Sequence, residues 1–172
     1  MILSPQELKE VYQGLVLQMG HPDPIGYMTR AFLSSGGDTE YFGTDGKMGF
    51  MPVEPERVAN MVGNVDISSL QGNVVATLTM DMMYFEAYQT ITDMIVAFHY
   101  GEQAISDDGN YTGEIKKFLD EVDGARSAMR DIVAPPRATV RDVMNMMKAQ
   151  LTGMNKADKL TMDVMNLILE ER

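Results

Sequence analysis

The stretch that decides the fold reads Leu33-Ser34-Ser35-Gly36-Gly37-Asp38 and, after seven further residues, Gly46-Lys47-Met48-Gly49-Phe50-Met51-Pro52. Glycine recurs through residues 34–52, and glycine adopts backbone conformations that other residues avoid. A cluster of glycines between two periodic, apolar segments is typical of a loop that turns sharply at fixed positions. We therefore expect residues 34–52 to form a structured loop rather than a strand.

Apolar residues recur at helical spacing on both sides of this loop. The first helix is expected to begin at Ser4-Pro5-Gln6-Glu7, because a serine cap, a proline at the first helical position and a glutamate three residues after the cap form a typical helix start. It is expected to end before Gly20. Asp23-Pro24 opens a second helix that is expected over residues 24–33, and further helices are expected over residues 55–62, 73–88, 92–98, 113–122 and 125–132. No segment alternates with the period of a strand, so the predicted fold class is all-α.

The composition limits the classes of site and partner. The chain has 172 residues, no cysteine and a net charge of −11, so disulfides and thiolate metal sites are excluded. The acidic character disfavours binding to nucleic acid and to an anionic cell-wall polymer, and a solvated acidic surface is its simplest interpretation. No segment is long and apolar enough to span a membrane. The N-terminus has neither a basic leader nor an apolar run, so no signal peptide is expected.

Ala134-Pro135-Pro136 is the strongest candidate for a domain boundary. We expect one helical domain over residues 1–133 and an amphipathic helical hairpin over residues 137–172. The hairpin is rich in methionine, whose flexible side chain suits adaptable contact surfaces. Docking of the hairpin against a partner and packing against the parent domain remain two open interpretations.

The glycine-rich stretch resembles the opening motif of the lytic transglycosylase and goose-type lysozyme family, in which Glu-Ser-Gly-Gly precedes Gly-Ala-Met-Gly-Leu-Met-Gln. Later segments resemble further family motifs in the same order: Asn73-Val74 before an apolar helical run, Val96-Ala97-Phe98-His99-Tyr100-Gly101, and Glu114 with Phe118-Leu119. The resemblance covers about residues 22–125. It implies a lysozyme-like helical domain with a cleft for a glycan strand.

The residues that carry the family's chemistry are replaced in this chain. The catalytic glutamate of the family falls on Ser34 and its glutamine on Pro52, while its Tyr-Asn pair becomes Phe98-His99. In the family the glutamate protonates the glycosidic oxygen, and a serine hydroxyl is far too weak an acid for this step. The resemblance therefore implies that no catalytic residue is present. Three nearby carboxylates are weak candidates for a displaced acid: Asp38, Glu40 and Glu54.

The resemblance also implies which residues would line a cleft that binds glycan. They fall at or beside the matched motifs: Ser34, Ser35, Met48, Gly49, Met51, Phe98, His99, Tyr100 and Glu114. His99 could bind a ligand or respond to pH, but a structural hydrogen bond is the commoner role for such a histidine. Because the chain has only two histidines and no cysteine, we expect no metal site, and we expect no cofactor.

The favoured interpretation is a catalytically inactive relative of the lytic transglycosylases that acts as a structural or interaction component of a bacteriophage virion, in its tail or ejection apparatus. Its partners would be other virion proteins, bound through residues 137–172, with at most residual binding to peptidoglycan glycan. It would be found in the virion, or in the host cytoplasm before assembly. One alternative is an active peptidoglycan lytic transglycosylase or hydrolase with a displaced acid. Another is a carbohydrate-binding domain without turnover.

Overall fold

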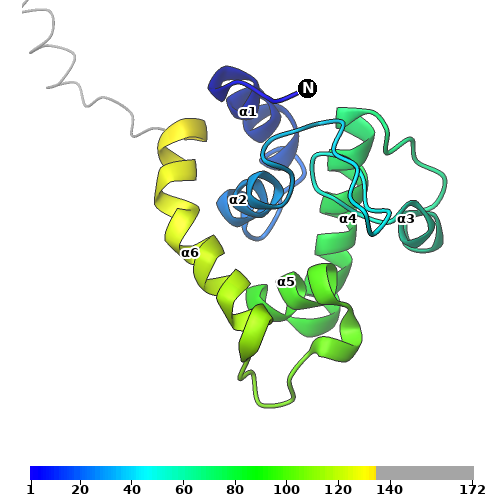
Figure 1. The fold of residues 1–172 in the computed structure, drawn as a ribbon, viewed down its shortest axis with the longest axis vertical. Helices are drawn as coiled ribbons and strands as arrows, with labels where there is room; N and C mark the ends of the chain where they lie inside the picture. Colours follow the sequence, from blue (N-terminus) through cyan, green and yellow to red (C-terminus); the bar gives the residue numbers. More distant parts are fainter. Residues whose placement is uncertain (135–172) are drawn as a thin grey trace, which may run out of the picture. The chain divides into compact units, whose positions relative to one another are not determined.

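Helices make up most of residues 1–134, the part of the chain that the computed structural model describes (Figure 1). The elements are α1 (Pro5–Val11), the π-helical turn η1 (Tyr12–Val16), α2 (Pro24–Ser35), α3 (Pro55–Met61), α4 (Leu70–Tyr88), α5 (Ile91–Tyr100), the 3₁₀ turn η2 (Glu102–Ala104) and α6 (Gly113–Val133). These residues contain isolated β-bridges but no strand, so the all-α prediction is confirmed for them. None of their helices is both long and apolar enough to cross a membrane. The hairpin predicted over residues 137–172 lies outside the described residues.

The local signals for the first two helices are confirmed. The Ser4 hydroxyl accepts the Glu7 N–H at 3.3 Å, and the Glu7 carboxylate accepts the Ser4 N–H at 2.8 Å, which together form a capping box. The helix continues beyond Val11 as the turn η1. α2 begins after Asp23, whose carboxylate accepts the Gly26 N–H at 3.1 Å.

α4 is buried along most of its length. Its buried residues are mainly apolar, but Asn73, Thr77 and Asp81 lie among them. The helix begins at Leu70, three residues before the predicted start, because the Ser69 hydroxyl caps it by accepting the Gly72 N–H at 3.1 Å. α5 packs against α4, and α6 packs against α2 (Figure 1).

α6 is one continuous helix, whereas the sequence predicts two helices over residues 113–122 and 125–132. Gly124 lies at the expected break, but a glycine inside a helix costs only about 1 kcal/mol relative to alanine. Tertiary contacts on both sides of it offset this cost. Val122 and Met129 are buried, and the Arg126 guanidinium donates two hydrogen bonds of 2.6 Å to the Asp23 carboxylate at the start of α2.

The glycine-rich loop between α2 and α3 is held against α4 by one side chain. Asn73 accepts the Met51 N–H at 2.9 Å and donates through Nδ2 to the carbonyls of Met48 and Met51, at 3.3 and 3.2 Å. Gly49 has a φ of +94°, and a Cβ atom at this position would overlap the Asn73 side chain. Phe50 and Met51 are fully buried. The loop is therefore structured, as predicted, and it forms part of the core.

Candidate functional site

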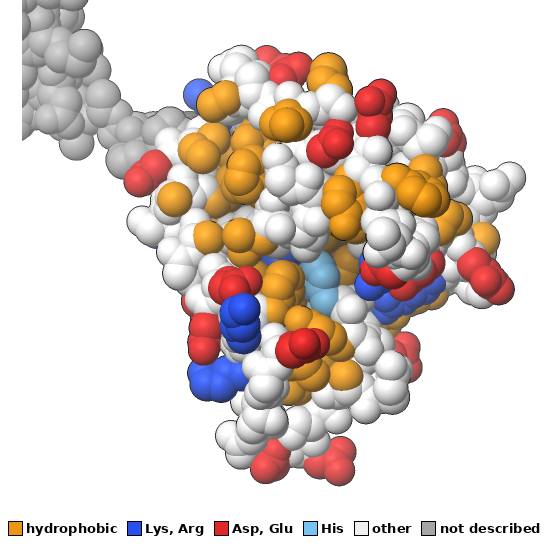
Figure 2. Space-filling model, viewed as in Figure 1, with side chains coloured by type: hydrophobic (Ala, Val, Ile, Leu, Met, Phe, Trp, Pro, Cys, Tyr) orange, Lys and Arg blue, Asp and Glu red, His pale blue; other side chains and the backbone are white. Residues whose placement is uncertain are grey.

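A cavity of about 240 Å³ lies where the end of α2, the glycine-rich loop and the end of α5 meet. These three segments supply its lining residues: Ser34, Tyr41, Asp45, Lys47, Pro52 and His99. Figure 2 shows a histidine at the bottom of a hollow in one face of the molecule, between hydrophobic side chains. Ser34, Pro52 and His99 are three of the positions that differ from the transglycosylase motifs, and the structure brings all three to this cavity, which we call the first cavity.

The end of α2 sets the positions of Ser34 and Ser35. Gly36 follows the helix in the left-handed conformation, with a φ of +66°, and its N–H bonds to the Phe32 carbonyl at 2.8 Å. The Ser35 hydroxyl is buried and donates to the Ala31 carbonyl at 2.8 Å. Ser34 is half-buried. Only the first of the two serines therefore lines the cavity.

His99 lies in the last turn of α5, which Arg57 of α3 holds in place. The Arg57 guanidinium donates to the carbonyls of Ala97 and Phe98, at 2.7 and 2.6 Å, as cations commonly do at a helix C-terminus. The His99 ring packs against the Phe118 ring of α6, with 4.7 Å between their centroids. Three helices thus fix the position of one imidazole at the cavity.

Arg30 determines which nitrogen of His99 carries the proton. Its Nη1 lies 3.4 Å from Nε2 of His99, and because a guanidinium only donates, Nε2 is the acceptor. The proton of the neutral ring is therefore on Nδ1. Burial lowers the pKa of His99 well below its ordinary value, and the Arg30 charge lowers it further. The imidazole is thus neutral at physiological pH.

Arg30 also belongs to a buried charged cluster in the core. Its guanidinium is fully buried and forms an ion pair with Asp81. His21 accepts the Asp23 N–H through Nδ1 at 3.0 Å, so its Nε2 carries the proton that it donates to Asp81, also at 3.0 Å. Burial alone would raise the pKa of Asp81, but the Arg30 charge and the hydrogen bonds from His21 and Arg30 lower it.

Sequence reasoning missed this cluster, although the chain carries a signal for it. Arg30 is the only charged residue of α2, and Asp81 interrupts an apolar run in α4. A charge within an apolar run of a helix is usually buried only if it is paired. Two such helices therefore indicate an ion pair between them.

Asp45 is the carboxylate among the lining residues, and sequence reasoning did not single it out as a site residue. It accepts the Lys47 N–H at 3.2 Å, and its Oδ2 lies 3.1 Å from Lys47 Nζ. The backbone hydrogen bond from Lys47 lowers the pKa of Asp45 most, and the side-chain contact lowers it further. The Asp45 carboxylate is therefore ionised at neutral pH.

The three candidates for a displaced acid do not line the first cavity. Asp38 and Glu40 contact the Met1 amino group, at 2.6 and 3.1 Å. The hydrogen bond from that amino group lowers the pKa of Asp38. Glu54 is half-buried, with Oε1 at 3.8 Å from Lys47 Nζ. Its other oxygen, Oε2, is buried and has no hydrogen-bond partner among residues 1–134.

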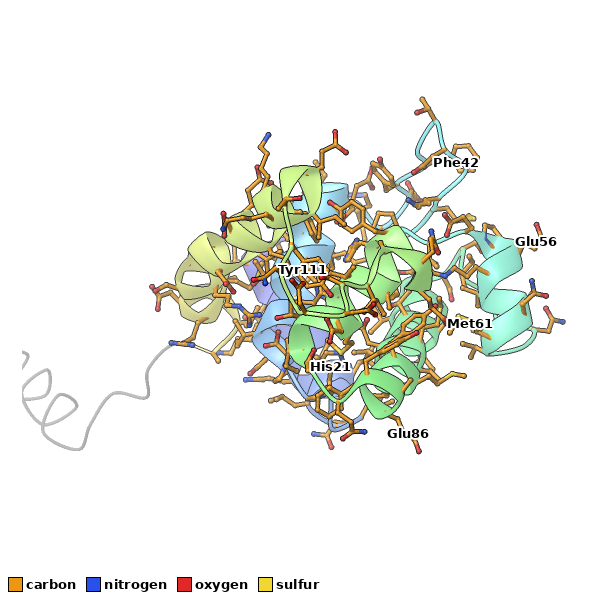
Figure 3. The ribbon with its side chains drawn as sticks, turned by 90° about the horizontal axis from the view of Figure 1, so that it is seen from below. His21, Phe42, Glu56, Met61, Glu86 and Tyr111 are labelled. Carbon is orange, nitrogen blue, oxygen red and sulfur yellow. The ribbon has the colours of Figure 1, made fainter. Side chains whose placement is uncertain are left out.

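A second cavity, of about 280 Å³, shares Tyr41 with the first. Its walls come from the glycine-rich loop and from the segment before α4: Thr39, Glu40, Tyr41, Phe42, Met48, Gly49, Ile67 and Ser68. Phe42 is 73 % exposed, and Figure 3 shows it at the tip of the loop, away from the helices. Two of the predicted cleft residues, Met48 and Gly49, lie in this second cavity.

The other predicted cleft residues line neither cavity. Met51 and Phe98 are buried in the core. The Tyr100 hydroxyl donates to the Glu114 carbonyl at 3.5 Å, and the Glu114 side chain is exposed in the first turn of α6. The predicted set is therefore divided between two cavities, the core and the start of α6.

Comparisons with protein-family models, with curated proteins and with solved structures found no match to this chain. Within residues 1–134, no group of three or more histidine, aspartate or glutamate side chains is placed to hold a metal ion. The first cavity offers a serine and a tyrosine hydroxyl, a neutral imidazole and a lysine–aspartate ion pair. These groups can bind a polar ligand, but the carboxyl group is ionised and the imidazole is neutral, so neither is in the form that acid catalysis requires at neutral pH.

Proposed function

We propose that this protein is a catalytically inactive relative of the lytic transglycosylases that serves as a structural or interaction component of a bacteriophage virion. One observation carries the proposal. Ser34, Pro52 and His99 line a single cavity, and the carboxylate in that cavity, Asp45, is ion-paired with Lys47. The acid, the glutamine and the asparagine of the family motifs would fall on the first three of these positions.

The protonation states in the first cavity support the loss of catalysis. Cleavage of a glycosidic bond requires a protonated group whose pKa lies near the working pH. The lowered pKa of Asp45 leaves it ionised, and the lowered pKa of His99 leaves it neutral. General acid catalysis is worth roughly 10²–10⁴ in rate, so a cavity without such an acid would support little turnover.

Exposed apolar side chains are compatible with a role in contacts with other proteins. Phe42 projects from the loop tip (Figure 3), and Ile2 is 71 % exposed. Isolated apolar residues are common on protein surfaces, so these two residues are compatible with the role but do not identify a partner. The assignment to a virion rests on the resemblance, since transglycosylase-like domains occur on phage tail and ejection proteins. The hairpin expected over residues 137–172 remains the proposed docking element.

A zymogram with purified bacterial cell wall tests the loss of catalysis. We expect no clearing by the wild-type protein. Ser34→Glu places a carboxyl group at the end of α2, and clearing by this variant would mean that the rest of the cavity can still orient a glycan. Ser34→Gln is the matched control, because it has the same size but no acidic proton. Clearing by the wild-type protein would overturn the proposal.

Glu54 is the strongest candidate if the alternative, an active enzyme with a displaced acid, is correct. Its buried Oε2 has no hydrogen-bond partner among residues 1–134, although Arg57 Nη1 lies 3.9 Å away, and a catalytic role is one explanation for such an atom beside strain or a bound water or ion. If the wild-type protein clears cell wall, Glu54→Gln should abolish the clearing. Asp38→Asn and Glu40→Gln should then leave it intact.

Quantitative mass spectrometry of purified phage particles tests the proposed location. We expect the protein at a constant copy number per particle, together with tail or ejection proteins. Presence in the lysate but not in washed particles would contradict a role in the virion.

A further inference from the structure

Three hydrogen-bonding groups of the first cavity have no partner among residues 1–134: the hydroxyls of Ser34 and Tyr41 and the Nδ1–H of His99. None of them is one of the buried unpaired atoms of this part of the chain, so all three reach solvent. A hydroxyl can rotate to suit a ligand, but the imidazole cannot exchange its roles while Arg30 donates to Nε2 at 3.4 Å. The cavity therefore presents one fixed donor and two adjustable groups.

The charges around His99 favour an anionic ligand. Lys47 lines the cavity, Arg30 Nη1 lies 3.4 Å from Nε2 of His99, and Arg57 donates to the carbonyl of the preceding residue. All three cations lower the pKa of His99, whereas Asp81 opposes them. Figure 2 shows basic side chains beside the hollow, partly covered by acidic ones. The ring thus lies in an electropositive region of a chain whose net charge is −11.

Asp45 does not cancel this positive region. Both the backbone N–H and the ammonium group of Lys47 contact its carboxylate, at 3.2 and 3.1 Å. The Lys47 ammonium has three donors, so its contact to Asp45 and its longer contact to Glu54, at 3.8 Å, leave a donor for a ligand. Lys47 is also only partly exposed, which weakens the screening of its charge by solvent.

We propose that the first cavity binds the carboxylate group of a small ligand. A carboxylate has two acceptor oxygens and no donor, and it would accept from the Nδ1–H of His99, the Ser34 hydroxyl and the Lys47 ammonium. Pro52 supplies an apolar wall for the rest of the ligand. This binding goes beyond the proposed function, because it does not depend on whether the protein cuts cell wall.

Propionate and propionamide are matched probes, because they have nearly the same shape and differ in charge. Each is titrated into isotopically labelled full-length protein while NMR follows the Ser34 amide, the Lys47 ammonium and the His99 ring. We expect saturable shifts with propionate and at least about tenfold weaker binding of propionamide. Equal affinity for the two probes, or no saturable shift with propionate, would overturn the proposal.

Lys47→Met tests the contribution of the cavity's cation. We expect this variant to bind propionate about tenfold more weakly. Lys116→Met is the control, because Lys116 lies on the surface of α6 and pairs with Asp120 at 2.9 Å. Equal losses of affinity in the two variants would mean that propionate responds to the overall charge of the protein and not to this cavity, and would contradict the proposal. If the amide spectrum of Lys47→Met shows misfolding, Ser34→Ala tests the proposed site through its hydroxyl donor instead, with an expected severalfold loss of propionate binding, and unchanged binding would contradict the proposal.

The ring proton of His99 provides an independent readout. A long-range proton–nitrogen correlation spectrum distinguishes Nδ1–H from Nε2–H in a neutral imidazole. We expect Nδ1–H in the free protein and a downfield shift of this proton when propionate binds. A proton on Nε2 would contradict the proposed donor. Zymography and these titrations measure different properties, so each proposal can fail alone.

Discussion

The two long loops of residues 1–134 are stabilised in opposite ways. The loop over residues 36–54 is bound to the core, since Asn73 of α4 makes three hydrogen bonds to its backbone. The loop over residues 101–112 is bound mainly to itself, since the Asp108 carboxylate accepts from Ser106 at 2.5 Å and from the Asn110 N–H at 3.0 Å. Three hydrogen bonds connect this second loop to α5: from the Gly101 N–H to the Ala97 carbonyl, from Gln103 Nε2 to the Tyr100 carbonyl, and from the Tyr111 hydroxyl to Asp93.

The difference shows which loop can carry a site. The glycine-rich loop contributes lining residues to both cavities, so any change in its path also changes the cavities. The loop over residues 101–112 is largely exposed and contributes to neither of them. Polar groups held by buried partners are costly to disturb, whereas polar groups held by exposed neighbours are not.

The largest difference between the loops is expected for one glycine in each. Gly49→Ala should lower the free energy of unfolding by about 4 kcal/mol, because it adds backbone strain and displaces Asn73 from its hydrogen bonds. Gly109→Ala should cost about 1 kcal/mol, since Gly109 has a φ of +70° but nothing lies near the added methyl group. Chemical denaturation measures both values. Similar losses in the two variants would mean that the loops are equally constrained.

A smaller effect is expected when only the side-chain anchor is removed. Asn73→Ala should cost about 3 kcal/mol, because it leaves the buried N–H and carbonyl of Met51 without their partner. Tyr111→Phe, which removes one of the three hydrogen bonds between the other loop and α5, should cost less than about 1 kcal/mol. Only Asn73→Ala should also change the cavities, and this change should appear as shifted amide signals of residues 41–52. A loss in Tyr111→Phe equal to that in Asn73→Ala would contradict the comparison.

His99, at the first cavity, should make the free energy of unfolding depend on pH. Its pKa is 6.5 in model peptides and well below this in the folded protein. Below pH 6.5 the unfolded chain therefore binds a proton that the folded protein does not, and stability falls as the pH falls. The loss should reach about 1.4 kcal/mol at pH 5.5, relative to pH 7.5. Denaturation at the two pH values measures it, and His99→Asn should remove this part of the dependence. An unchanged dependence in the variant would assign it to other groups.

The smallest effect on stability is expected from Asp108, in the exposed loop over residues 101–112. Hydrogen bonds, first from the Ser106 hydroxyl and then from Asn110, lower the pKa of Asp108 to about 2. A group with a lowered pKa contributes stability above its unfolded value of 3.8 and loses this contribution as the pH falls toward 2. Because Asp108 is exposed, solvent screening keeps the contribution small. NMR titration of the carboxyl carbon should show the low pKa and a rise toward the ordinary value in Ser106→Ala. An ordinary pKa in the wild-type protein would mean that this loop lacks its internal hydrogen bonds.

Local signals predicted the helices where their cause lies within one turn. The serine cap at Ser4 and the aspartate cap at Asp23 act on the next three residues, so the chain alone reveals them. The predicted break at Gly124 was wrong. The ion pair that holds this part of α6 joins Arg126 to Asp23, which lies 103 positions earlier in the chain, so no local pattern indicates it. The predicted start of α4, at residue 73, also lies three residues after the observed one, because the prediction did not include the cap at Ser69.

The candidate site was predicted in part. Ser34 and His99 were selected through the resemblance and lie in the first cavity, together with Pro52. Asp45 was not selected, because no motif marks it and its role depends on its contact with Lys47. Met51 and Phe98 were selected but are buried in the core, since apolar residues beside a motif commonly pack rather than bind.

The sequence by itself determined the helical class, the caps of the first two helices and the presence of a structured glycine loop, because each depends on residues close together in the chain. Only the tertiary structure decided which polar groups meet. Arg30 and Asp81 are 51 positions apart, and Arg30 and His99 are 69 apart. The packing of α2, α4 and α5 brings these groups into hydrogen-bonding distance, and buried charges are costly unless they are paired. This packing, rather than any local motif, places the neutral imidazole of His99 at the cavity.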